Sequence, residues 1–319
     1  MIPSFVTSFM EICQFILVFV TTPFYLFLWC FMVRSQIRKV DEIATPFFKL
    51  CISSAIIDFG TLFSNLFGLM IPRLGLFTDF YMYLDRIYAH IYFYIAWSTG
   101  ICQAISVSVL ATNRLSGLIF PEGYEKMWRS NKIWIAIAIQ FLPGMSVGLL
   151  TFFNEATLAV NERNVLVPQF SNKAMTALFF TIGGGFLLTN CTYLISAYCY
   201  ILIIFRKRNI KLANLFANVT RAKEQSRKRE IRLFTMCSII VSVQMTVLLF
   251  FVLKVAKPID INIDEFYIMY TLLSDVFASI HPYLLWIFSD SLRKYVLQQI
   301  GFQKSTRSIN TAIIMTTVS

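Results

Sequence analysis

Long apolar stretches alternate with short polar segments along the whole chain. An α-helix needs about 20 mainly apolar residues to cross roughly 30 Å of hydrocarbon. Seven stretches reach that length: Ile12–Val33, Phe47–Ile71, Ile87–Ala111, Ile133–Phe153, Ala174–Phe205, Leu233–Leu253 and Phe266–Phe288. Because backbone groups in lipid must be paired within their own segment, we expect each stretch to be a helix. The pattern predicts an all-α membrane protein, built as a seven-transmembrane helix bundle.

The basic residues between these stretches fall overwhelmingly on one side of the predicted bundle. Of the 28 Lys and Arg residues, 22 lie in or beside the first, third and fifth connections and the C-terminal tail. Loops rich in Lys and Arg are normally the cytoplasmic ones. We therefore expect the N-terminus outside and the C-terminus in the cytoplasm, and seven crossings also require opposite sides.

Composition and charge narrow the function classes further. Hydrophobic residues make up 57% of the chain and the mean hydropathy is +0.66, which leaves little room for a soluble protein. The net charge of +11 lies mostly on the predicted inner face, where anionic lipids and acidic partners attract it, so it does not indicate nucleic-acid binding. Metal-ligand spacing, phosphate-binding loops and nucleophile motifs are missing from the sequence, so we expect no enzyme, no metal and no cofactor.

The sequence predicts one membrane domain over residues 1–300. Its outer segments are short, which favours a small molecule or short peptide bound between the helices. All seven cysteines fall in predicted helices, so a disulfide between the third helix and the second outer connection is not available. Ser289–Ile300 has an amphipathic pattern suited to the inner membrane surface. Residues 301–319 are rich in Ser and Thr, and we expect a disordered cytoplasmic tail.

Two acidic residues fall deep within the apolar stretches. Counted from the predicted cytoplasmic ends, Asp58 and Asp275 both lie about 16–20 Å into the bilayer. Equal depth predicts a shared polar cluster, for which Asn65 and His281 are among the candidate partners. An ionisable residue in a membrane is costly, and it commonly marks a functional site. The four candidates for such an intramembrane switch are Asp58, Asp275, His281 and Pro282. The alternative is hydrogen bonding that simply holds the helices together.

Aromatic residues are concentrated in the outer halves of the third and seventh stretches. Such side chains offer apolar area with a polar tip, as a small-molecule pocket requires. Tyr92 and Trp97 are the more deeply placed, and together with Tyr270 they are the candidates for a ligand pocket. The aromatic belt at the membrane interface is the alternative explanation for those nearest the surface.

The residues after the third stretch carry a recognisable pattern. It consists of Asn113-Arg114, then Phe120-Pro121, then a Tyr-x-Lys-x-Trp run ending at Trp128. This segment resembles the one that follows the third helix in nematode serpentine chemoreceptors. The class gamma group of the Srg superfamily is most similar, and its class V relatives are the near alternative. A second segment, His281–Arg293, resembles the Pro-containing end of the family's seventh helix.

The resemblance implies a G-protein-coupled receptor in the plasma membrane of chemosensory neurons. Its partners would be a small-molecule ligand and a heterotrimeric G protein. Arg114 would take the place of the Arg that restrains the fifth and sixth helices of rhodopsin-like receptors, although Asn113 replaces the acid that usually precedes it. The sixth stretch contains neither Pro nor Trp, so the usual switch of that helix does not carry over.

The connection between the fifth and sixth stretches carries ten of the cations and is the expected contact for an acidic G-protein surface. The candidate coupling residues are Asn113, Arg114, Arg206, Lys207, Arg208, Arg227, Lys228 and Arg229. Helix motion could be absorbed at Gly183–Gly185, Pro143-Gly144, Pro23 and Pro282. Close packing of small faces is an equally good explanation for the three successive glycines.

Two other functions remain open from the residues. A seven-helix ligand-gated channel would have the inverted orientation, with the N-terminus in the cytoplasm, against the distribution of Lys and Arg. A receptor with a non-sensory role, such as peptide signalling, would have the expected orientation. A transporter is disfavoured because no internal repeat is found.

Overall fold

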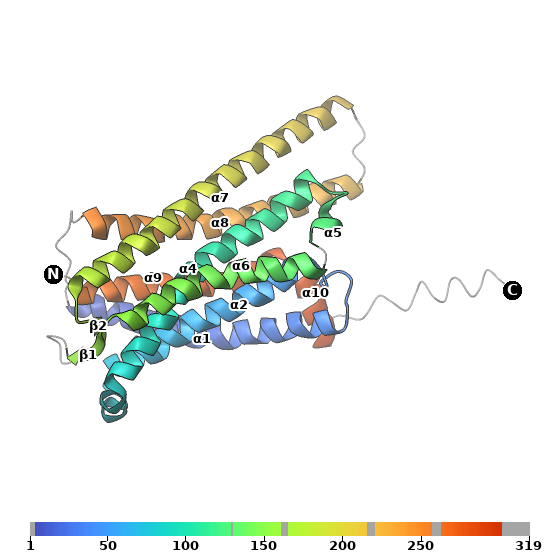
Figure 1. The fold of residues 1–319 in the computed structure, drawn as a ribbon. Coiled ribbons are helices and arrows are strands. Elements are labelled where there is room, and N and C mark those ends of the chain that lie inside the picture. The colour runs from blue at the N-terminus through green and yellow to red at the C-terminus, as the bar shows by residue number, and fades with distance from the viewer. Residues whose placement is uncertain (1–3, 129, 161–164, 216–220, 257–262, 302–319) are drawn as a thin grey trace.

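The computed structural model is a bundle of long helices that run side by side (Figure 1). It describes residues 4–128, 130–160, 165–215, 221–256 and 263–301. Its seven long helices are α1 (Ser4–Ile37), α2 (Pro46–Asn65), α4 (Thr78–Ile119), α6 (Ser130–Leu149), α7 (Lys173–Leu215), α8 (Arg221–Ala256) and α9 (Ile263–Phe288). Three shorter helices are α3 (Ile71–Arg73), α5 (Tyr124–Met127) and α10 (Asp290–Gln299). The sequence predicts a disordered tail over residues 301–319, and all of these except Gly301 lie outside the described residues.

Within the described residues, six helices are long and apolar enough to cross a membrane. The helix at the sixth predicted stretch, α8, contributes a shorter apolar segment, Ser238–Leu253. The first three turns of α8 carry the charges of Arg221–Arg232. Helix α7 likewise extends ten residues beyond its predicted end at Phe205, since the cations that follow include no Pro or Gly.

Two short strands cross one end of the bundle. They are β1 (Ala156–Val160) and β2 (Leu166–Phe170), and they pair antiparallel with Ala156 opposite Phe170. The hydrophobic pattern does not predict these strands, which add a small hairpin to the predicted helix bundle. We call this the hairpin end and the opposite end, which carries α5 and α10, the α10 end (Figure 1).

The second membrane helix changes its winding near the hairpin end. A π-helical turn, η1 (Leu66–Met70), separates α2 from α3. The N–H of Ile71 bonds the carbonyl of Leu66, and Pro72 has no N–H to offer the carbonyl of Phe67. The hydroxyls of Tyr81 and Tyr88 on α4 both donate to that carbonyl, the first at 3.1 Å. The widened turn therefore becomes a contact between α2 and α4.

Glycines allow α4 and α6 to approach closely. A Cβ on Gly144 would overlap the Sγ of Cys102 and the carbonyl oxygen of Ser98. A Cβ on Gly148, one turn later, would overlap the hydroxyl of Ser98 and lie 2.8 Å from the carbonyl oxygen of Tyr94. Small residues four apart are a common way for membrane helices to pack. Gly144 is therefore part of a packed face, whereas the sequence also allowed a flexible point.

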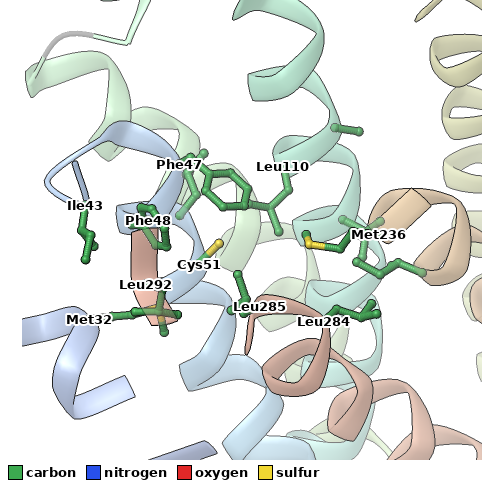
Figure 2. Close-up of a cluster of buried hydrophobic side chains, with 14 of the residues drawn as sticks. Met32, Ile43, Phe47, Phe48, Cys51, Leu110, Met236, Leu284, Leu285 and Leu292 are labelled. Carbon is green, nitrogen blue, oxygen red and sulfur yellow. The ribbon is translucent and has the colours of Figure 1, made fainter. Parts of the chain in front are cut away.

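Buried side chains form one large cluster at each end of the bundle. The cluster at the α10 end joins α1, α2, α4, α8 and α9, and Figure 2 shows part of it, including Phe47, Leu110, Met236 and Leu285. Helix α10 contributes Leu292, which is fully buried there. The apolar face of α10 therefore packs on the protein itself. The other cluster joins α4, α7, α8, α9 and β2 at the hairpin end.

Candidate functional site

A small cavity lies among the helices that carry the hairpin-end cluster. Its volume is about 40 Å³. Its walls come from α4, α7, α8 and α9, and they include Trp97, Gly100, Gly183, Leu187, Phe251 and Tyr270. Of the three aromatic residues that the sequence nominates for a pocket, Trp97 and Tyr270 line it. Tyr92 does not, because five residues turn a helix by about 140° from Trp97. Its ring packs on Gly68 of η1 instead.

Stacked aromatic rings connect the hairpin to this cavity. The ring of Phe170 in β2 stacks on Phe93 of α4, with 4.1 Å between centroids, and on Phe179 of α7 at 5.3 Å. Phe179 in turn contacts Trp97 in the cavity wall at 5.2 Å. Phe170 and Phe179 are both buried. The hairpin therefore packs directly above the cavity.

Two glutamines supply amide groups in a mainly apolar lining that also includes Ser274. Gln103 of α4 and Gln244 of α8 are both buried. Neither Oε1 nor Nε2 of Gln244 has a hydrogen-bond partner within the described part of the chain. Neither residue stands out in the sequence, because an uncharged amide is a weak signal in an apolar stretch. A buried polar group inside a membrane helix is nevertheless costly enough to be informative.

Asp58 lies at the centre of a buried polar cluster formed by four helices. The hydroxyl of Tyr25 on α1 donates to its Oδ2 at 2.7 Å, and the Nε2 of Gln103 on α4 donates to its Oδ1 at 2.9 Å. The Nδ1 of His281 on α9 lies 3.1 Å from Oδ2, outside hydrogen-bond geometry. All four side chains are buried. Of the proposed switch residues, Asp58 and His281 are thus in contact, and Pro282 follows directly in α9.

Asp275 belongs to a second cluster nearer the hairpin end. Its Oδ2 accepts from the Nε2 of Gln14 on α1 at 2.6 Å, and its Oδ1 accepts from the Nδ2 of Asn65 on α2 at 2.7 Å. The prediction that Asp58 and Asp275 share one cluster is therefore wrong, although Asn65 is one of the partners it names.

The depth estimate failed because it treated the ends of α2 and α9 as level. His281 is seven residues from the end of α9 at Phe288, whereas Asp58 is twelve residues from the start of α2 at Pro46. Since Asp58 and His281 lie side by side, the two helix ends are offset by about five residues. The two acidic clusters are consequently separated by about two helical turns, or roughly 10 Å.

The Asn-Arg pair lies in the last two turns of α4, which continues to Ile119, at the opposite end of the bundle. The guanidinium of Arg114 lies over the ring of Phe47 at the start of α2, with 3.4 Å from its carbon to the ring centroid. Asn113 is buried, and its Oδ1 accepts a hydrogen bond from the hydroxyl of Tyr124 at 3.3 Å. The ring nitrogen of Trp128 donates to the hydroxyl of Ser116 at 2.7 Å.

These contacts explain the spacing between the Asn-Arg pair and the Tyr-x-Lys-x-Trp run that follows it. Tyr124 and Trp128 lie one helical turn apart around α5, and they bond Asn113 and Ser116 on α4. Burial raises the pKa of Tyr124, while its bond to Asn113 and the nearby charge of Arg114 lower it less. The hydroxyl therefore remains protonated, and able to donate, throughout the physiological pH range.

The other predicted coupling cations lie on α7 and α8. Figure 1 shows α7 leaning away from the other helices toward the α10 end. Arg206 and Lys207 are exposed on this part of α7. Arg208 is also on α7, and Arg227, Lys228 and Arg229 are on α8, but these four side chains lie outside the described part of the structure.

A comparison with protein-family models decides the class of the protein. Residues 14–302 match the family described as serpentine type 7TM GPCR chemoreceptor Srv. The chain belongs to this family. The resemblance to nematode serpentine chemoreceptors is therefore confirmed at that level, while the class gamma assignment is not. Srv is a receptor family, and the chain is a multi-pass membrane protein. Among curated proteins, none matches the chain.

Proposed function

We propose that this Srv receptor binds a small molecule in the cavity beside Trp97 and activates a heterotrimeric G protein at the α10 end. One observation carries the proposal: Gln103 lines the cavity and also donates a hydrogen bond to Asp58. A ligand can shift a conformational equilibrium only through different affinities for the two states. A side chain shared by the cavity and a buried polar cluster provides such a difference.

The route from the cavity continues through Asp58 to α9. A ligand that draws the amide of Gln103 toward itself weakens the bond to Asp58. Asp58 then changes its contact with His281, which directly precedes Pro282. Proline lacks an N–H and interrupts the helical hydrogen bonds, so α9 has a natural hinge there. Helix α9 ends at Phe288 and is joined through Ser289 to α10, at the end where the G protein is proposed to bind.

The distribution of basic residues supports a G-protein site at the α10 end. The basic residues accumulate at the α10 end, which the positive-inside rule places in the cytoplasm. The hairpin end and the N-terminus then face outside. The exposed cations of α7, including Arg206 and Lys207, offer a surface for an acidic G protein. We place the receptor in the plasma membrane of chemosensory neurons, since the family is one of chemoreceptors.

The size of the cavity favours a small molecule over a peptide. About 40 Å³ is too small for a peptide side chain with its backbone, and the hairpin packs above it. A peptide receptor would need an open outer surface between the helices. The proposal therefore commits to a small-molecule ligand.

Epitope tags test the orientation directly. A tag at the N-terminus should be accessible to antibody on intact cells, and a tag at the C-terminus only after permeabilisation. Energy transfer between labelled G-protein subunits, compared with cells lacking the receptor, then measures coupling. A hidden N-terminus with an exposed C-terminus would contradict the proposal and favour an inverted ligand-gated channel, which agonist-evoked current would reveal.

A further inference from the structure

Gln244 is an unusual residue in the wall of the cavity. It is fully buried on α8, at 0% exposure, and neither amide atom has a hydrogen-bond partner within the described residues. Buried polar groups in proteins almost always have partners, because an unpaired one loses the hydrogen bonds that water provides. Since Gln244 lines the cavity, its partner can be a group that occupies the same space.

The rest of the wall sets the character of that occupant. The rings of Trp97, Phe251 and Tyr270 line the cavity, and Phe251 and Tyr270 meet edge to face at 5.5 Å. None of the described lining residues carries a charge. A buried ion without a counter-charge is far less stable than a buried neutral molecule. The lining therefore selects against both cations and anions.

We infer that the cavity recognises a small neutral molecule with an apolar body and one hydroxyl, carbonyl or amide group, which Gln244 binds. This inference rests on the proposed function, in which the cavity is the ligand site. The amide of Gln244 offers both a donor and an acceptor. An alcohol can pair with either, and a primary amide can pair with both.

Gly183 lets the walls of the site lie close together. A Cβ at this position would lie 3.0 Å from the Trp97 ring and 3.4 Å from the Phe251 ring. Glycine therefore lets α7 approach the two rings that form the apolar walls. With a volume of about 40 Å³, the site as it stands holds little more than a polar head group, so binding of an apolar body requires the aromatic walls to move apart.

Four probes with one isobutyl body and different head groups test the inference. They are isobutanol, isopentane, isobutylammonium and isovalerate, which present a hydroxyl, a methyl, a cation and an anion. Each is titrated against the full-length receptor in lipid nanodiscs, with the shift in thermal unfolding as the measure of binding. Isobutanol should raise the unfolding temperature most, isopentane less, and the two ions should have no specific effect.

Replacing the amide isolates its contribution. Gln244→Leu should weaken isobutanol binding about ten-fold, the equivalent of one hydrogen bond, and leave isopentane binding unchanged. Gln244→Met provides an unbranched apolar replacement of similar length if the leucine variant folds poorly. Gln140→Leu is the matched control, because Gln140 is an equally buried glutamine that accepts a bond from Ser53 and does not line the cavity.

Three outcomes would overturn the inference. They are tighter binding of either ion than of isobutanol, wild-type preference for isobutanol in both Gln244 variants, and no binding of isobutanol to the wild-type receptor. G-protein activation is measured separately, by energy transfer in cells. Selective binding of isobutanol without G-protein activation would therefore reject the proposed function but support the role of Gln244. G-protein activation without a preference for isobutanol would support the proposed function but reject the role of Gln244.

Discussion

The Nε2 of Gln103 donates a hydrogen bond to the Oδ1 of Asp58 at 2.9 Å, while the same side chain lines the cavity. This one residue therefore links the candidate ligand site on α4 to a buried acid on α2. Asp58 also contacts α1 through Tyr25 and α9 through His281. Four helices meet at a single carboxylate, so a change at the cavity can alter their relative positions.

We expect Gln103→Leu to raise basal G-protein activation. Leucine cannot donate to Asp58, and a lost hydrogen bond to a charged partner corresponds to about 1.5–3 kcal/mol, enough to change a two-state ratio ten-fold or more. The variant thus imitates a receptor in which a ligand has drawn Gln103 away. Energy transfer between G-protein subunits in unstimulated cells, normalised to surface expression, provides the measurement. Basal activity equal to that of wild type would remove Gln103 from the proposed route.

A control separates this effect from lost stability. Tyr25→Phe also removes a donor to Asp58, but Tyr25 does not line the cavity. The melting temperature of the Tyr25→Phe receptor should fall, because the buried side chain of Asp58 loses a hydrogen-bond partner. Tyr283→Phe removes a partly buried bond to Thr21 and should cost less. Isobutanol binding should be unchanged in both variants.

A second prediction concerns Arg114. Its guanidinium lies over Phe47 of α2, whereas the resemblance to rhodopsin-like receptors implies a restraint on the fifth and sixth helices. Arg114→Ala should sever or alter the G-protein response and leave surface expression largely intact. Phe47→Leu should cause a partial change, because a cation–π contact contributes about 0.5–2 kcal/mol.

The neighbouring phenylalanine provides the comparison. Phe48 is buried beside Phe47, and its ring meets that of Phe47 at 5.4 Å. Phe48→Leu should lower the melting temperature about as much as Phe47→Leu does, but it should preserve the G-protein response. An unaltered response in the Arg114→Ala receptor would exclude this residue from signalling.

The helical architecture could be predicted because hydropathy acts along each segment independently. The ends of the segments could not, since α7 and α8 continue through charged residues that favour helix without favouring lipid. The hairpin is hidden for a related reason. Its strands have five residues each, and Pro168 in β2 argues against a strand by its missing N–H.

The candidate site was predicted less completely than the fold, because a site depends on the relative heights of different helices. Sequence spacing places Trp97 and Tyr270 in the correct half of the bundle, and both line the cavity. It cannot show that Asp58 is level with His281 and Asp275 with Asn65. An uncharged cavity residue such as Gln244 cannot be recognised from the sequence until the positions of the neighbouring helices are known.

A third prediction uses the glycines as a matched pair. Gly144→Ala should lower the melting temperature, because the new Cβ would overlap the backbone oxygen of Ser98 and push α4 and α6 apart. Overpacking of this kind costs about 1–3 kcal/mol. Gly185→Ala should be neutral or stabilising by up to about 1 kcal/mol, since nothing lies within 4 Å of its Cβ and alanine favours helix. Equal melting temperatures for the two variants would contradict the close-packed interface.

The last prediction concerns how the hairpin stays above the cavity. The Oδ1 of Asp85 accepts a hydrogen bond from the backbone N–H of Leu158 at 2.8 Å, and Asp85 itself lies at a kink in α4, with φ 21° and ψ −98°. The segment between α6 and α7 contains no cysteine, so this bond and the Phe93–Phe170 stack hold the hairpin where many seven-helix receptors use a disulfide.

Asp85→Ala should therefore increase hydrogen exchange of the Leu158 amide about ten-fold or more, because the amide loses its acceptor. Asp85→Asn should retain much of the protection, since its side-chain oxygen can still accept. Exchange measured by mass spectrometry on the receptor in nanodiscs distinguishes the two. If the hairpin is the cover of the ligand site, isobutanol should also dissociate faster from the alanine variant than from the asparagine variant. Equal exchange in both would mean that the aromatic stack alone positions the hairpin.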